Sequence, residues 1–140
     1  VGPTVQTQAL RVVSDPRVTA DGVSAANLRA LFDHNIQVRD MVSDVNRTVA
    51  RVRAAQTRLR GATGAAADTL SKLNDIAATL ITPSVRYSKP ELQTHITYLY
   101  SMTNRTDQRV PRDAVNRYAE LRKQLDVVQL ALSRLLGPAM

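Results

Sequence analysis

The chain has 140 residues, of which 44% are hydrophobic, and this is enough for a single domain with a proper core. It contains no Cys, which excludes disulfides, thiolate metal sites and a cysteine nucleophile. The formal net charge is +7 and is carried almost entirely by Arg. An excess of Arg can attract an anionic partner, but it is also the composition that a high-GC genome produces, and we favour the second interpretation.

Neither a membrane span nor a signal peptide is predicted. No run of the chain approaches the ~18 apolar residues that a span needs, and no signal-peptide pattern is visible. The chain begins at Val1 rather than Met, so we expect a processed product or a fragment of a longer protein. Only 4% of the residues are aromatic, and a core built from Leu, Val, Ile and Ala suits helices packed side by side.

The N-terminal stretch does not have a helical pattern. Residues 4–13 are rich in β-branched side chains and partly alternate, which predicts a single strand closed by a turn at Asp15-Pro16. A lone strand has no sheet to join in this chain. We therefore expect residues 1–22 to be an extended segment, the last strand of an absent β domain followed by a linker. In isolation it would pack along the bundle, pair with another copy or be disordered.

The most informative feature is a long helix expected between Ser24 and Arg60. Ser24 is a good N-cap, Gly61 follows the last helical position, and no Gly or Pro lies between. Residues spaced alternately by three and four draw one stripe along this helix, and eight of these ten are apolar: Leu28, Leu31, Asn35, Val38, Val42, Val45, Val49, Val52, Gln56 and Leu59. A helix about 50 Å long with such a stripe requires partner helices.

Two polar residues, Asn35 and Gln56, interrupt the stripe. They could be ligand contacts inside a bundle, or they could fix the register of the helices. We favour the structural interpretation.

Three further helices are predicted. One covers residues 65–81 and ends at Thr82-Pro83. The next begins at the sequence Ser88-Lys89-Pro90-Glu91, with Ser88 as the capping residue, and ends near Met102. The last is opened by Val110-Pro111 and terminated by Gly137-Pro138.

These elements predict an all-α fold, an antiparallel four-helix bundle over residues 23–137 with a tail at 138–140. Short links between the stripes favour an up-down-up-down arrangement. In a second solution, the two shorter helices form one broken partner to the two long ones. The sequence does not separate these two solutions.

No catalytic, metal or cofactor site is expected. The two histidines, His34 and His95, lack the neighbouring ligands of a helical metal site, and Glu91 and Glu120 are the only glutamates. The chain has no Gly-rich phosphate loop and no nucleophile motif. A stacking surface of interleaved aromatic residues is also absent, so nucleic acid is not expected as a partner.

Two small groups of side chains remain as candidates for binding. Arg47, Arg51 and Arg58 lie close to one face of the long helix and are the candidate anion contacts. His95, Tyr98 and Met102 share a face beside the main stripe of their helix. They could line a small pocket, but we favour the interpretation that they form the margin of the core.

One pattern resembles a known family. The run from Ala9 to Val18, which contains Ser14-Asp15-Pro16-Arg17, followed by a long helix with Arg39-Asp40-Met41, resembles the C-terminal region of large exported bacterial proteins with sortilin-like (VPS10-type) or BNR-repeat β-propellers. Such proteins are usually described as glycosyl hydrolases. In that family a small β-sandwich follows the propellers and a helical segment of this length comes next. The resemblance implies that any sugar chemistry resides in the propellers, outside this chain.

The expected function is therefore that of a non-catalytic helical accessory or assembly domain of an exported, periplasmic or extracellular bacterial protein. Its partners would be the domains of its own parent, or a second copy bound through the N-terminal strand. Neither a nucleic acid nor a membrane is the expected partner. The alternative is a free-standing basic helical bundle that binds an anionic polymer or a membrane surface.

Overall fold

A computed structural model describes residues 5–137 and is entirely helical there, which confirms the all-α class. The helices are α1 (Pro16–Ala20), α2 (Ala25–Arg58), α3 (Ala65–Leu80), α4 (Leu92–Thr103) and α5 (Arg112–Leu136). No strand occurs within residues 5–137. Residue 4 of the expected strand and the expected tail at 138–140 lie outside the described residues.

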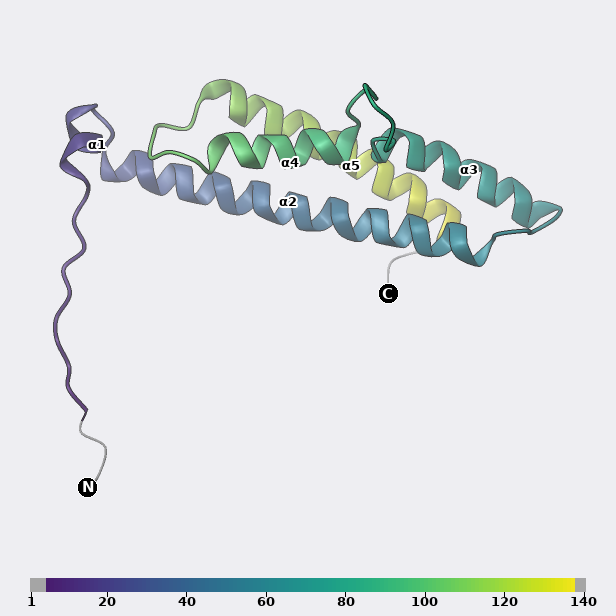
Figure 1. Cartoon of the computed structure of the whole chain (residues 1–140), viewed down its shortest axis with the longest axis horizontal. Helices are drawn as coiled ribbons and strands as arrows, with labels where there is room; N and C mark the ends of the chain where they lie inside the picture. Colours follow the sequence, from purple (N-terminus) through teal and green to yellow (C-terminus); the bar gives the residue numbers. More distant parts are fainter. Residues whose placement is uncertain (1–4, 138–140) are drawn as a thin grey trace.

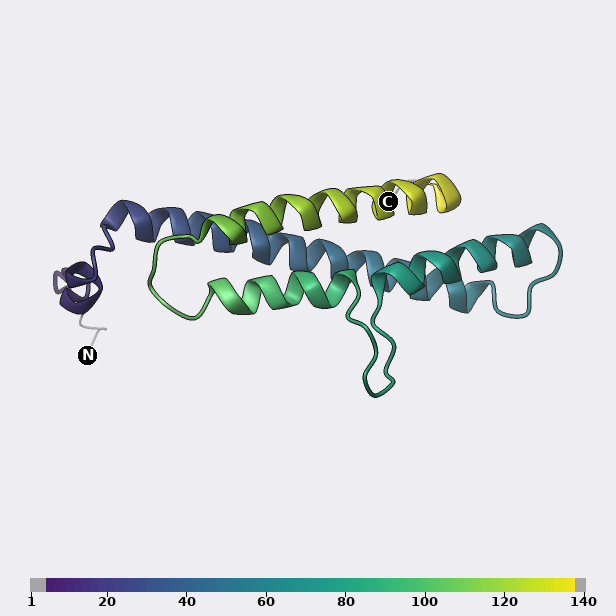
Figure 2. The ribbon, with the colours of Figure 1, turned by 90° about the horizontal axis from the view of Figure 1, so that it is seen from above.

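The bundle is three helices thick, with α2 as its longest member (Figure 1). From α2, the chain returns through α3 and then α4, which lie one after the other along α2 and run in the same direction (Figure 2). Asn46 on α2 contacts Gln93 on α4, while Asn35 contacts Thr103, so α4 is antiparallel to α2. Of the two predicted solutions, the structure has the broken partner, and it does not confirm the up-down-up-down arrangement.

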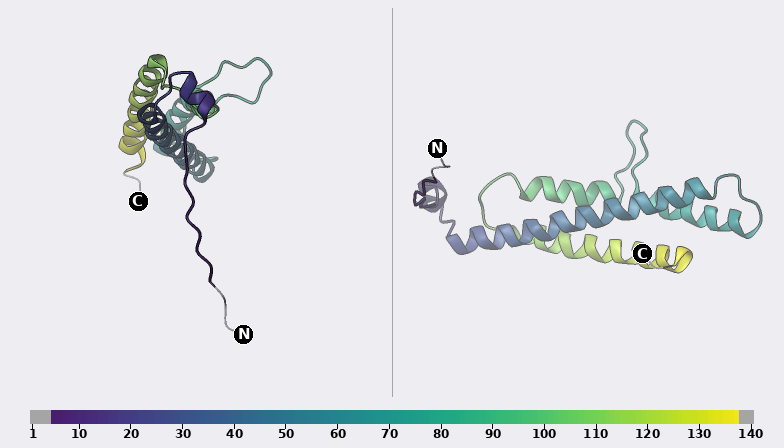
Figure 3. Two further views of the ribbon diagram at one scale, coloured as in Figure 1. Left: turned by 90° about the vertical axis from the view of Figure 1, so that its left-hand side faces the viewer. Right: turned by 90° about the horizontal axis from the view of Figure 1, so that it is seen from below.

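α5 runs parallel to α2. Side chains at positions 44, 48 and 51 of α2 bond to residues 122, 129 and 137 in that order. Seen end-on, α2, the α3–α4 pair and α5 occupy three corners (Figure 3). Residues 59–64 connect α2 to α3 at one end of the bundle, and residues 104–111 connect α4 to α5 near the other.

Local sequence signals account for most helix ends. Ser24 forms a capping box with Asn27, since the Ser24 hydroxyl accepts from the Asn27 N–H while the Asn27 side chain accepts from the Ser24 N–H. Gly64 precedes α3 with a φ of 58°, a left-handed conformation that favours glycine. The predicted bounds of α2, α3 and α5 agree with the structure to within two residues.

The expectation that residues 1–22 are extended is wrong at Pro16–Ala20, which form α1. The Asp15 carboxylate accepts from the N–H of Arg17, and Pro16 occupies the first helical position. Asp15-Pro16 therefore begins a short helix instead of forming only a turn. Residues 5–14 have no regular structure and no β pairing, and they extend away from the bundle (Figure 1).

The predicted cap of α4 is also wrong. Ser88 donates its hydroxyl to the carbonyl of Val85 in the preceding loop, and α4 begins at Leu92. The N–H of Glu91, which a capping Ser88 would have accepted from, donates to Thr82 Oγ1 at 2.8 Å. Residues 81–91 thus form a loop that is closed at its base by Thr82 and projects from the bundle between α3 and α4 (Figure 2).

The buried face of α2 is rotated from the predicted stripe. Its buried positions follow a strict three-four alternation: Leu31, His34, Val38, Met41, Val45, Thr48, Val52 and Ala55, with Val49 buried beside them. Of the predicted column at 28, 35, 42, 49 and 56, only Val49 is buried, and the others are partly exposed. Val38, Val45 and Val52, which belong to the predicted stripe, are fully buried as expected. The column at 34, 41, 48 and 55 is buried as well because it faces α5, where His34 packs against Tyr118 and Thr48 bonds to Gln129.

The other helices supply leucines and one isoleucine to this core. The fully buried ones are Leu73, Leu80, Ile96, Leu121, Leu125 and Leu132. These side chains form one continuous cluster with the α2 face. Burial of this apolar surface is the main force that holds α3, α4 and α5 onto α2.

Candidate binding surfaces

A polar network joins α2 to α5 at mid-length. Arg122 on α5 donates to Asp44 on α2 at 2.8 Å and to Asp126 at 2.5 Å, and it also contacts Gln129. Gln129 in turn donates to the hydroxyl of buried Thr48. Burial disfavours the charged guanidinium, but its bonds to Asp126 and Asp44 outweigh this effect and raise the pKa of Arg122. The network fixes the register of the two helices.

Two of the three candidate anion contacts lie at this network. Arg47 and Arg51 line a cavity of about 310 Å³ together with Thr48 and Ser133. Arg47 is paired with Asp44 at 2.5 Å, and Arg51 donates to the carbonyl of Gly137. Their guanidinium groups are therefore engaged with the protein itself, and an acidic side chain shares the cavity.

Arg58 is separate from this cavity. It is the last residue of α2, exposed at the far end of the helix, and does not line the cavity with Arg47 and Arg51. The structure thus brings together two of the three predicted residues. Anion binding at this site stays a prediction, and the engagement of Arg47 and Arg51 gives it no support.

Both polar residues of the predicted stripe make contacts between helices. Asn35 donates to the backbone carbonyl of Thr103 on α4 at 3.1 Å, and Gln56 donates to Asn74 on α3 at 2.9 Å. Each bond ties α2 to one of the two short helices. These contacts favour the interpretation that the two residues fix the register.

His34 is a buried polar residue on the side of α2 that faces α5, and it is 7% exposed. Its ring packs edge-on against Tyr118 of α5, with centroids 5.9 Å apart. Nε2 has no hydrogen-bond partner in the described structure. Burial disfavours the charged imidazolium and lowers the pKa of His34 below its ordinary value.

The stability of the bundle is expected to depend on this histidine at mildly acidic pH. Because the pKa of His34 is lower in the folded state, the unfolded chain binds the proton more readily. The free energy of unfolding is then highest above pH 6.5, the ordinary value, and falls as the pH drops from there to the lowered folded-state pKa. Urea denaturation between pH 7.5 and 5 measures the slope. His34→Leu is expected to remove this part of the slope, and an unchanged slope in that variant would contradict the assignment.

The described N-terminal residues carry large apolar side chains that touch nothing in the bundle. Val5, Leu10, Val12 and Val13 are between 68% and 88% exposed. At the base of this segment the backbone carbonyl of Gly22 accepts from Arg109, at 2.8 Å. This bond holds the end of the segment against the loop that joins α4 to α5.

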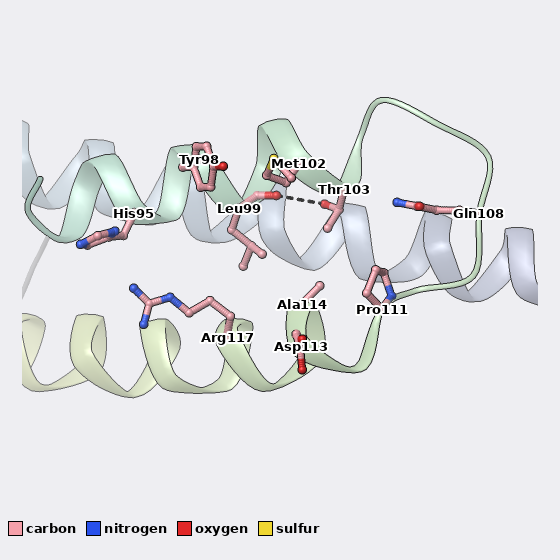
Figure 4. A pocket seen from close by; sticks show the side chains of 10 residues that line it. All are labelled: His95, Tyr98, Leu99, Met102, Thr103, Gln108, Pro111, Asp113, Ala114 and Arg117. Carbon is pink, nitrogen blue, oxygen red and sulfur yellow. Dashed lines mark hydrogen bonds between the residues drawn. The ribbon is translucent and has the colours of Figure 1, made fainter.

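His95, Tyr98 and Met102 line a groove between α4 and the start of α5 (Figure 4). The groove encloses about 500 Å³. The sequence predicts that the three α4 residues share one face, but it favours the interpretation that they form the margin of the core. The α5 wall, with Pro111, Ala114 and Arg117, was missed because it comes from a distant part of the chain and carries no motif.

In the described residues, no helix combines the length and apolarity needed to cross a membrane. Residues 5–137 also contain no cluster of three or more His, Asp or Glu side chains that could hold a metal ion. No protein-family model, no curated protein and no solved structure matches this chain. The resemblance to propeller-containing exported proteins therefore stays a prediction.

Proposed function

We propose that this chain is a non-catalytic helical accessory or assembly domain of a larger exported protein, and that residues 5–13 join it to β structure outside the bundle. The observation that carries the proposal is the exposure of this segment. It is extended, unpaired and rich in β-branched residues, and the side chains of Leu10 and Val12 are 88% and 87% exposed. A segment of this composition adds readily to the edge of a sheet.

The geometry of the segment's base supports a joining role. α1 and the bond from Arg109 to Gly22 connect the segment to the bundle without a long flexible linker. Pairing of the segment with a sheet would therefore also orient the bundle relative to that sheet. The parent that the resemblance implies, with a β-sandwich next to its helical segment, would supply such a sheet, and the propellers would carry any glycosyl hydrolase activity.

Hydrogen exchange tests the proposal. In the chain alone, the amides of residues 6–13 are expected to exchange at the rate of an unfolded peptide, because nothing covers them. In the full-length gene product they are expected to exchange at least about tenfold more slowly, as amides in a paired strand do. The exchange of α2 serves as the internal control, since its core is buried in both samples.

Two outcomes would contradict the proposal. If residues 6–13 exchange equally fast in the full-length protein, the segment does not join the bundle to β structure. If light scattering shows that the chain alone is a dimer and its segment is protected there, the segment pairs with a second copy instead.

A further inference from the structure

We propose that the groove between α4 and α5 binds a small amphipathic carboxylate, with the carboxylate on Arg117 and the apolar part along Leu99, Met102 and Ala114. This inference is independent of the joining role of the N-terminal segment. It rests on the walls of the groove, on its volume and on the position of its cationic end.

The floor and sides of the groove are apolar. Leu99 and Ala114 form the buried floor, 6% and 9% exposed, and Pro111 closes one end. Tyr98 and Met102 stand at the rim, 62% and 51% exposed. These two large apolar side chains remain in water in the free protein, so a ligand that covers them gains the free energy of burying them.

The two ends of the groove differ in chemistry. The guanidinium of Arg117 and the imidazole of His95 lie at the same end, one from each helix, while Pro111 lies at the other (Figure 4). Asp113 also belongs to the lining, but its carboxylate points away from α4 (Figure 4). The groove therefore offers cationic and imidazole donors at one end and a mainly apolar surface along its length, with Gln108 beside Pro111 at the other end (Figure 4).

Arg117 has donors left for a ligand. Its Nη1 donates to Glu120 at 3.1 Å, and the side chains of Arg117 and Glu120 are 41% and 62% exposed. An exposed pair of this kind contributes little to stability. A guanidinium has five N–H groups, so a ligand carboxylate can bind to those that do not face Glu120.

The volume and length of the groove define the size of the ligand. About 500 Å³ lies in the range of sites for small molecules. From His95 to Met102 the groove follows two turns of α4, which is about 10 Å. A medium-chain carboxylate such as octanoate spans this distance with its head at Arg117 and its tail at Pro111.

Titration of the protein with octanoate, followed by NMR of methyl-labelled methionine, tests the site. The Met102 methyl resonance is expected to shift and saturate, while the resonance of Met41, which is fully buried in the core, stays in place. For a ligand of roughly ten non-hydrogen atoms, the expected dissociation constant is about 1 mM. Octanol, which lacks the charge, is expected to bind about tenfold more weakly.

Two matched variants locate the carboxylate. Arg117→Gln is expected to weaken octanoate binding about tenfold and to leave octanol binding unchanged, because one charge-assisted contact is lost. Arg134→Gln, an exposed arginine near the other end of the same helix, is expected to change neither. Helix content by circular dichroism confirms that both variants are folded.

Three results would overturn the proposal. The first is no shift of the Met102 resonance at octanoate concentrations about ten times the expected dissociation constant. The second is equal weakening by Arg117→Gln and Arg134→Gln. The third is an equal shift produced by acetate, which would mean that the apolar groove takes no part.

Discussion

Met41→Ala is expected to lower the free energy of unfolding by about 3 kcal/mol, in the range found when a buried Met or Leu is cut back to Ala. Met41 is 1% exposed and belongs to the continuous hydrophobic core that α2 shares with the other helices. Its removal leaves a cavity among side chains that cannot close around it. Urea denaturation monitored by circular dichroism measures the change as a shift of the midpoint.

The matched control is Val42→Ala. Val42 belongs to the predicted stripe, but it is only partly buried in the structure. We expect this variant to lose about 1 kcal/mol, since a side chain that keeps part of its surface in water gains less from burial. A larger loss at Val42 than at Met41 would mean that α2 is rotated from the position described.

Arg122→Ala is expected to lower the free energy of unfolding by about 2 kcal/mol. Arg122 and Asp44 are 25% and 31% exposed, so the loss lies below the ~3–5 kcal/mol of a fully buried pair. The substitution leaves Asp44 and Asp126 without this cation, and it removes the donor to Gln129. Denaturation at low and at high salt measures the loss, which is expected to change little with salt because the pair is partly shielded from solvent.

The comparison variant for this prediction is Arg29→Ala. Arg29 pairs with Asp33 one turn along α2, but the two side chains are 74% and 51% exposed. Its loss is expected to be below about 0.5 kcal/mol. A double-mutant cycle with Asp44→Ala isolates the pair between the helices, and a coupling energy near zero would show that the network does not hold α5 to α2.

The ends of the helices could be predicted from the sequence because they depend on residues close to them. Ser24 caps α2, Gly64 precedes α3, and Pro111 precedes α5, as the sequence indicates. Ser88 fails as a cap because Thr82, at the start of the same loop, accepts from the N–H of Glu91. A local pattern cannot show such a competitor.

The rotation of α2 could not be predicted for a similar reason. The predicted stripe includes Val42, which is only partly buried, and omits His34 and Thr48, which are buried although they look like surface residues. Thr48 is acceptable in the core because it bonds to the carbonyl of Asp44 and to Gln129. Hydrophobicity alone leaves these two residues out, and the side chains that cover them, Tyr118 and Gln129, come from α5.

In each candidate site, the residues of one helix could be predicted from the sequence, but their partners on other elements could not. The α4 side of the groove could be found from the spacing of His95, Tyr98 and Met102, but the cation opposite them comes from α5. Arg47 and Arg51 were found as neighbours on one helix face, but their acceptors, Asp44 and Gly137, decide what they do. Sequence spacing identifies residues on one helix, and only the packing shows what faces them.

The loop at residues 81–91 separates two helical hairpins, each formed by helices that are neighbours in the sequence. One contains the end of α2 and α3, and the other contains α4 and the start of α5. Each hairpin joins elements that are adjacent in sequence, so its closure costs little chain entropy and its contacts form early in folding. We expect α3 to open separately, since it packs on the far end of α2 while α4 packs nearer the start of α2. Fraying of α3 would leave α4, the groove and the base of the N-terminal segment in place.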